Sequence, residues 1–256
     1  MTTECENERD VGKLASDHPK YRADIDGLRA IAVLSVVGFH ASPGVVKGGL
    51  VGVDIFFVIS GFLICSIIFG GLDQGTFSIT KFYSRRVRRI FPALIVVLVA
   101  CYAFGWFVLF PDEFRQLGKH IAAGAAFISN IALWREAGYF DNAAGVKPLL
   151  HLWSLGIEEQ FYILWPLLLL FISRRGIGLL SFTVFFVVIS FAINVLTINT
   201  DMVATFYLPL TRMWELLVGS VIAYVMLQNG KYAKSRQQPQ AYSFRPVYSQ
   251  KISASA

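Results

Sequence analysis

The sequence predicts an all-α, polytopic transmembrane helical bundle, and two observations support this. Of the 256 residues, 55% are hydrophobic and only 16% are charged, which leaves too little polar surface to cover a soluble globule. Apolar runs that approach the roughly 20 residues needed to cross a bilayer recur along the chain. Because these runs are continuous rather than alternating, they favour helices over a β-barrel.

Six of these runs are predicted to span the membrane. Proline and glycine residues mark the breaks between them. The first run is short, and the fourth reaches spanning length only together with residues 153–160. The runs are 28–42, 51–69, 90–110, 161–172, 177–199 and 210–227.

Basic residues predict the orientation of the bundle, because Lys and Arg in short loops stay cytoplasmic. The basic block at 81–89 places the N-terminus inside and the loop 43–50 outside. Residues 117–134 decide the number of spans, since a crossing there would put Arg174 and Arg175 outside. We therefore predict six spans, with seven as the alternative, and an interfacial or re-entrant segment at 117–134.

The predicted organisation has three parts, which are a cytoplasmic tail (1–27), a transmembrane domain (28–227) and a polar, disordered tail (228–256). The net charge of +6 is explained by membrane orientation rather than by nucleic-acid binding. The N-terminus lacks the basic start of a cleavable signal, so the first span is expected to be retained. The three cysteines lack paired spacing, which argues against a disulfide framework or a zinc site.

Ionisable residues inside apolar segments are costly, so each is a candidate functional residue. Arg29 and His40 lie eleven residues apart, within about 20° of one helical face and about 16 Å along the axis. A histidine alone in an apolar helix is more often a packing residue. Asp54, however, enters from the outer side at a similar depth and is a candidate to orient His40 as a base.

A second group of ionisable residues is predicted in the outer half of the membrane or at its boundary. The group can serve the substrate or the structure, because residues at i and i+3 on a helix can also neutralise each other. Its members are His151, Glu158, Glu159, Arg212 and Glu215.

Four arginines lie at the cytoplasmic mouth of the third run: Arg85, Arg86, Arg88 and Arg89. Taken alone, they are best interpreted as positive-inside anchors. Guanidinium groups also match phosphate geometry better than lysine does, and residues three apart share a helical face. The phosphates of coenzyme A are therefore a reasonable ligand.

The chain resembles membrane acyltransferase family 3, the O-antigen-acetylase-like proteins that acylate cell-envelope polysaccharides. The family motif of arginine or lysine, ten residues and histidine maps onto Arg29 and His40. Its R-x-x-R motif maps onto Arg86 and Arg89, with Arg85 and Arg88 as the alternative register. The resemblance covers about residues 20–227 and rests, in order, on YRADIDGLRAIAVLSVVGFH, GGLVGVDIFFVISGFLI, FYSRRVRRIFPAL, LLHLWSLGIEEQFYILWP and TRMWELLVGS.

The resemblance implies a multi-pass enzyme of the bacterial inner membrane with a cytoplasmic N-terminus and no bound cofactor. It implies transfer of an acyl group, usually acetyl, from acyl-CoA to a hydroxyl of a polysaccharide such as lipopolysaccharide, or of a glycolipid. In this scheme His40 takes the hydroxyl proton or carries the acyl group itself, and the R-x-x-R arginines contact acyl-CoA. Family members usually have more helices, so we expect a truncated domain, with an inactive truncated acyltransferase as an alternative.

Two other functional classes remain open. A transporter or flippase would line a pathway with buried charges and make no bonds, and broken-helix inverted repeats would favour it. A haem or metal protein would use His40, His120 and His151 as ligands. Their placement on separate segments argues against this, so no metal site is predicted.

Overall fold

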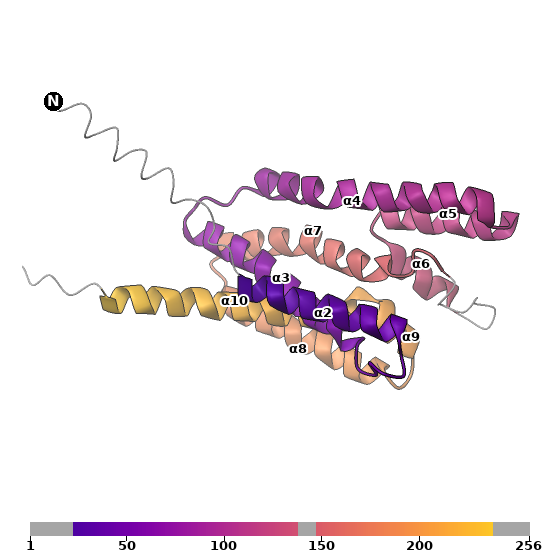
Figure 1. The fold of residues 1–256 in the computed structure, drawn as a ribbon. Helices are drawn as coiled ribbons and strands as arrows, with labels where there is room; N and C mark the ends of the chain where they lie inside the picture. The colour runs from indigo at the N-terminus through magenta and orange to yellow at the C-terminus, as the bar shows by residue number, and fades with distance from the viewer. Residues whose placement is uncertain (1–22, 138–146, 238–256) are drawn as a thin grey trace, which may run out of the picture.

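The computed structural model describes residues 23–137 and 147–237, with side chains described as far as residue 230. The regular elements in these ranges are all α-helices, as predicted (Figure 1). They are α2 (Ala23–Ala41), α3 (Val51–Asp73), α4 (Ile79–Val108), α5 (Pro111–Ala125), α6 (Ser129–Glu136), α7 (Leu152–Arg174), α8 (Leu179–Thr197), α9 (Met202–Tyr207) and α10 (Pro209–Gln237).

Five segments in the described part of the chain are long and apolar enough to cross a membrane. They overlap five of the six predicted runs. The first predicted run lies in α2, which is helical but is not among the five and carries Asp24, Asp26 and Arg29 in its first turns. The five segments are Val51–Asp73, Ile79–Val108, Leu152–Arg174, Leu179–Thr197 and Met202–Gly230.

The boundaries of the predicted tails shift in the structure. Helix α2 begins at Ala23, inside the stretch predicted as the N-terminal tail. Helix α10 continues to Gln237, although disorder was predicted from residue 228. The remaining parts of both tails, residues 1–22 and 238–256, lie outside the described residues.

Residues 117–134 do not form one continuous helix. Helix α5 ends at Ala125, and Phe127 adopts a positive φ of 56° before α6 begins at Ser129. Figure 1 shows α5 running back along α4 before α6 turns away. The end of α4 and the start of α7 meet, because Leu109 lines the same small cavity as Lys147 and Pro148. Whether this segment is interfacial or re-entrant stays a prediction.

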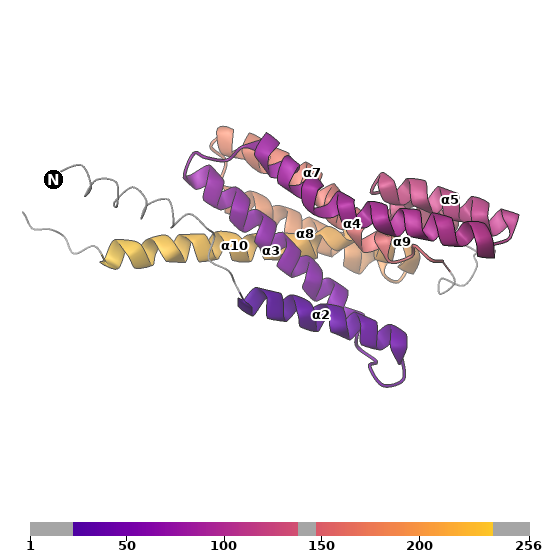
Figure 2. The same cartoon turned by 45° about the horizontal axis from the view of Figure 1, so that its top comes forward.

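The basic blocks gather at one end of the bundle. The start of α4 lies at the same end as the C-terminal ends of α7 and α10 (Figures 1 and 2). The arginines that begin α4 and the Arg174–Arg175 pair that ends α7 therefore share one side, as the positive-inside rule requires of cytoplasmic loops.

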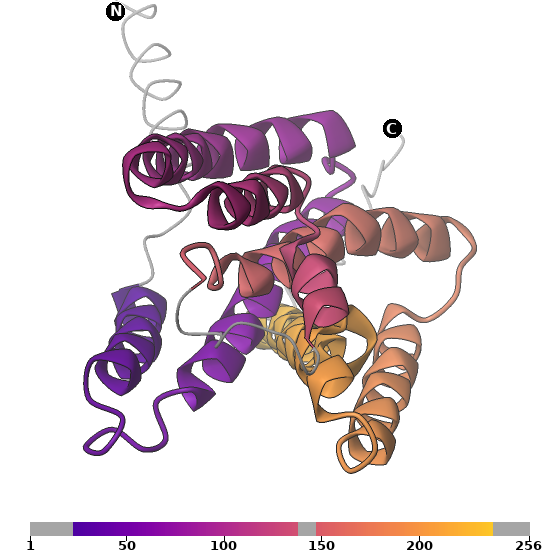
Figure 3. The same ribbon diagram turned by 90° about the vertical axis from the view of Figure 1, so that its right-hand side faces the viewer.

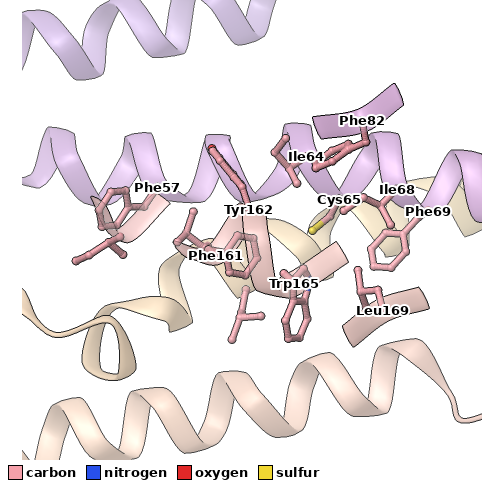
Figure 4. Packing of buried hydrophobic residues seen from close by; sticks show 14 of the residues in the cluster. Phe57, Ile64, Cys65, Ile68, Phe69, Phe82, Phe161, Tyr162, Trp165 and Leu169 are labelled. Atoms are coloured by element: carbon pink, nitrogen blue, oxygen red, sulfur yellow. The ribbon is translucent and has the colours of Figure 1, made fainter. Parts of the chain in front are cut away.

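Helices α3, α7 and α10 enclose the main core, while α2 lies at the edge of the bundle beside α3 (Figure 3). Side chains from α3 and α7 interleave in this core (Figure 4). On α7, the ring of Trp165 stacks on Phe161 with centroids 5.5 Å apart and on Phe182 of α8 at 5.8 Å. Burial of these large rings contributes much of the packing energy.

Two glycines allow the backbones of α3 and α10 to touch. A Cβ atom on Gly61 would meet the carbonyl oxygen of Leu216, and one on Gly219 would meet the backbone of Val58 and Phe62. Helices in a membrane gain little from the hydrophobic effect when they associate, so small residues at the crossing point give the close contact that holds them together.

We expect Gly219→Ala to lower the free energy of unfolding by about 1–3 kcal/mol, because the new methyl group collides with the backbone of α3. Thermal unfolding of the detergent-solubilised protein measures this. Gly118→Ala on α5 is the matched control, because no atom lies within 4 Å of its added Cβ and alanine favours the helix. Equal stability of the two variants would contradict this role of Gly219.

Candidate functional site

An inner cavity of about 450 Å³ lies between α2, α3, α4 and α7. Four guanidinium groups line it, from Arg29 on α2 and from Arg85, Arg86 and Arg89 on α4. The guanidinium of Arg86 lies 4.2 Å from the ring centroid of Tyr162, which fixes it against α7. Arg88 is not part of this lining, so the geometry favours the Arg86 and Arg89 register of the R-x-x-R motif.

Glu158 and Glu159 of α7 line the same inner cavity. Both residues are buried, and in each the Oε1 atom has no hydrogen-bond partner. They were predicted in one group with His151 and Arg212, in the outer half of the membrane or at its boundary, whereas those two residues line a different cavity. Glu158 and Glu159 lie two turns into α7, which carries them about 10 Å inward from its outer end to the level of the arginines.

An outer cavity of about 500 Å³ lies between α2, α3, α7, α9 and the start of α10. It brings together four of the predicted site residues, His40, Asp54, His151 and Arg212, beside the aromatic rings of Phe39, Trp153, Phe206 and Tyr207. The structure therefore divides the predicted site residues between two cavities. Arg29 and His40 lie on one face of α2, but Arg29 lines the inner cavity and His40 lines the outer one.

His40 is held by its own helix rather than by Asp54. Its Nδ1 lies 2.8 Å from the carbonyl oxygen of Val36. Because a carbonyl can only accept, this contact requires the proton on Nδ1 and leaves Nε2 with a lone pair. Nε2 is thus the nitrogen that can accept a proton or attack a carbonyl carbon.

Asp54 is bound by Arg212 of α10, which corrects the predicted pairing of Asp54 with His40. Its Oδ1 lies 2.5 Å from Arg212 Nη2, and Arg212 Nη1 lies 3.1 Å from Glu215 Oε1. The guanidinium can bind two carboxylates at once and keeps its charge, so it competes well against a neutral imidazole for Asp54. Glu215 is only 1% exposed, and therefore depends on this cation for neutralisation.

A third, mainly apolar cavity of about 200 Å³ lies along the contact between α2 and α3, lined by residues that include Ala32, Val37 and Gly52. It shares Phe56 with the inner cavity and Val36, Val53 and Ser154 with the outer one. The face of α2 between Arg29 and His40 thus borders three adjoining cavities.

His120 belongs to a separate polar cluster. Its Nε2 lies 2.7 Å from Glu136 Oε2, and Lys147 Nζ lies 3.3 Å from the same oxygen. Burial tends to raise the pKa of Glu136, but the hydrogen bonds and charges of His120 and Lys147 hold it below its usual value. Across the described residues, no three His, Cys, Asp or Glu side chains are placed to hold a metal ion.

The site residues that sequence reasoning missed are mainly aromatic. Tyr162 lies against Arg86, and the rings of Trp153 and Phe206 lie 5.7 and 5.9 Å from the Arg212 guanidinium. Aromatic residues recur throughout the apolar segments, so composition gave no reason to select these. One local pattern could have indicated Tyr162, because it lies four residues after Glu158 and therefore on the same helical face.

A membrane-embedded helical bundle with an arginine-lined cavity at one level and a histidine-lined cavity at another suits an enzyme that transfers a group from an anionic donor. A family model described as an acyltransferase domain matches residues 22–242. The chain therefore belongs to the membrane acyltransferase family 3.

Two relatives illustrate the similarity. The chain is 35% identical over 223 residues to peptidoglycan O-acetyltransferase OatA of Listeria monocytogenes, covering 80% of this chain and 34% of the relative. It is 35% identical over 192 residues to an uncharacterized protein of Haemophilus influenzae, covering 72% of this chain and 78% of the relative. The chain thus spans about a third of the length of OatA. No solved structure matches it.

We expect Arg212→Met to destabilise the protein by about 3–5 kcal/mol, because it leaves the buried Glu215 carboxylate without its cation. Adding Glu215→Gln should restore part of the loss, since it removes the unpaired charge. Thermal or denaturant unfolding in detergent measures both. Arg174→Met, at the exposed end of α7, serves as the control. If the double variant is no more stable than Arg212→Met, this account of the network is wrong.

Proposed function

We propose that this chain transfers an acyl group, most simply acetyl, from acyl-CoA to a hydroxyl of a cell-envelope polysaccharide or glycolipid. The observation that carries the proposal is the series of cavities running from the arginines of α4 to His40. The name of the relative OatA, a peptidoglycan O-acetyltransferase, supports a polysaccharide acceptor. The protein would lie in the bacterial cytoplasmic membrane with the arginines on the cytoplasmic side.

The donor would enter by the inner cavity. The phosphates of CoA would bind the guanidinium groups of Arg85, Arg86 and Arg89, whose planar forks match phosphate oxygens. The pantetheine arm would then lie in the apolar third cavity along α2. Arg29 and His40 lie about 16 Å apart along this helix, a span that the extended arm can bridge to bring the thioester to the outer cavity.

The acceptor would enter the outer cavity from the opposite side of the membrane. Its sugar ring would lie against the aromatic side chains there, with a hydroxyl directed at His40. Nε2 of His40 would accept the hydroxyl proton as the oxygen attacks the thioester carbonyl and CoA leaves. Alternatively, Nε2 would carry the acyl group between donor and acceptor.

We expect His40→Gln to reduce CoA release from acetyl-CoA by about 10²- to 10⁴-fold, because glutamine has no basic nitrogen to replace Nε2. A thiol-detection assay on the purified full chain measures CoA release. His120→Gln is the matched control, since His120 lies outside both cavities and glutamine can still bond Glu136. Parental CoA release by a folded His40→Gln protein would exclude this role.

The donor site has its own test. We expect Arg86→Gln to raise KM for acetyl-CoA about ten- to hundredfold with a smaller change in kcat, because it removes a charge-assisted contact to phosphate. Arg88→Gln removes an equal charge from outside the cavity lining and should leave KM almost unchanged. Similar KM values for the two variants would show that the arginines act as membrane anchors only.

A further inference from the structure

The outer cavity holds a second histidine beside His40. The ring centroids of His40 and His151 lie 4.8 Å apart with the ring planes at 86°. His40 ends α2, whereas His151 immediately precedes α7, so two separate helices bring the imidazoles together. If a single base carried out acyl transfer, His151 would have no role in the reaction.

The hydrogen bonding of His40 limits what this residue can do alone. Its Nδ1–H is directed at the carbonyl oxygen of Val36, so Nε2 is its single reactive nitrogen. If Nε2 carries the acyl group, another base must take the proton of the acceptor hydroxyl. Asp54 is poorly suited to this because Arg212 binds it.

His151 is suited to be that base. Neither of its ring nitrogens has a hydrogen-bond partner among the described residues. Burial, followed by the neighbouring His40, lowers the pKa of His151, so it is neutral near pH 7 and ready to accept a proton. The other ionisable groups around the cavity are Asp54 of α3, Tyr207 of α9, and Arg212 with Glu215 of α10.

We propose that His40 and His151 divide the reaction, with His40 carrying the acyl group and His151 acting as the base for the acceptor. This inference rests on the proposed acyl-CoA-dependent function. In the first step His40 Nε2 attacks the thioester carbonyl, the C–S bond breaks and CoA leaves as the thiolate. In the second step the acceptor oxygen attacks the acyl carbon, the C–N bond breaks and His151 takes the hydroxyl proton. His151 then releases that proton to solvent, from which the departed CoA thiolate has taken one up, so both imidazoles end as they began.

The test separates the two steps with labelled acetyl-CoA as donor and glycerol as a simple alcohol acceptor. Rapid mixing of the purified full chain should give a stoichiometric burst of CoA and a matching label on the protein that hydroxylamine removes. His151→Gln should keep the burst but discharge the label into glycerol about 10²- to 10⁴-fold more slowly. His40→Gln should give no burst, and His120→Gln should behave as the parent does.

The pH dependence of label discharge is a second measurement, and a purely structural role of His151 would not affect it. The rate at which the parent discharges its label should rise with pH as His151 loses its proton, and then level off. The midpoint of this rise should lie below the usual pKa of histidine. His151→Gln and a second variant, His151→Asn, should lack this step while eluting as folded protein.

Three outcomes would overturn the inference while leaving the proposed function in place. They are steady transfer by the parent without a burst, parental discharge by His151→Gln, and loss of burst and transfer together in both folded His151 variants. Absence of any CoA release by the parent would instead reject the proposed function, and the division of roles with it.

Discussion

The close approach of α3 and α10 is the constraint on which the outer cavity depends. Gly61 and Gly219 let the two backbones touch, and this fixes the depth of every other residue on the two helices. At the outer end, the same contact brings Arg212 of α10 to Asp54 of α3. One packing contact therefore sets both the helix register and the polar wall of the outer cavity.

Buried charge is the second consequence of this packing. Glu215 is almost fully enclosed, and an isolated carboxylate there would be strongly unfavourable. Arg212 neutralises it, binds Asp54 and lies against three aromatic rings. A guanidinium held from so many sides has little freedom to move. Arg212 therefore holds a fixed position in the lining of the outer cavity, which it shares with His40. The helix that carries His40, α2, packs mainly on α3.

Sequence reasoning worked where the relevant geometry is local. The eleven-residue spacing of Arg29 and His40 fixes a shared helical face, and the structure places both along one series of cavities. It failed for Asp54, whose partner lies 158 residues away and depends on the register between α3 and α10. It did not indicate that Glu158 and Glu159 line the inner cavity, because hydropathy locates a span but not the neighbours of each residue. The break at Phe127 lies within the segment predicted as interfacial or re-entrant, but no sequence pattern selected that residue.

The distribution of charge between the cavities bears on the direction of transfer. The inner cavity has four guanidinium groups against two carboxylates, whereas the outer one has two carboxylates near a single guanidinium. A polyphosphate donor is attracted to the first and repelled by the second. The third cavity, which adjoins both, is lined mainly by apolar and small side chains, beside which a phosphate would be costly to desolvate. Under the proposed function, the acyl group can therefore reach His40 while the charged part of the donor stays at the arginines, and free CoA is released to the side from which it came.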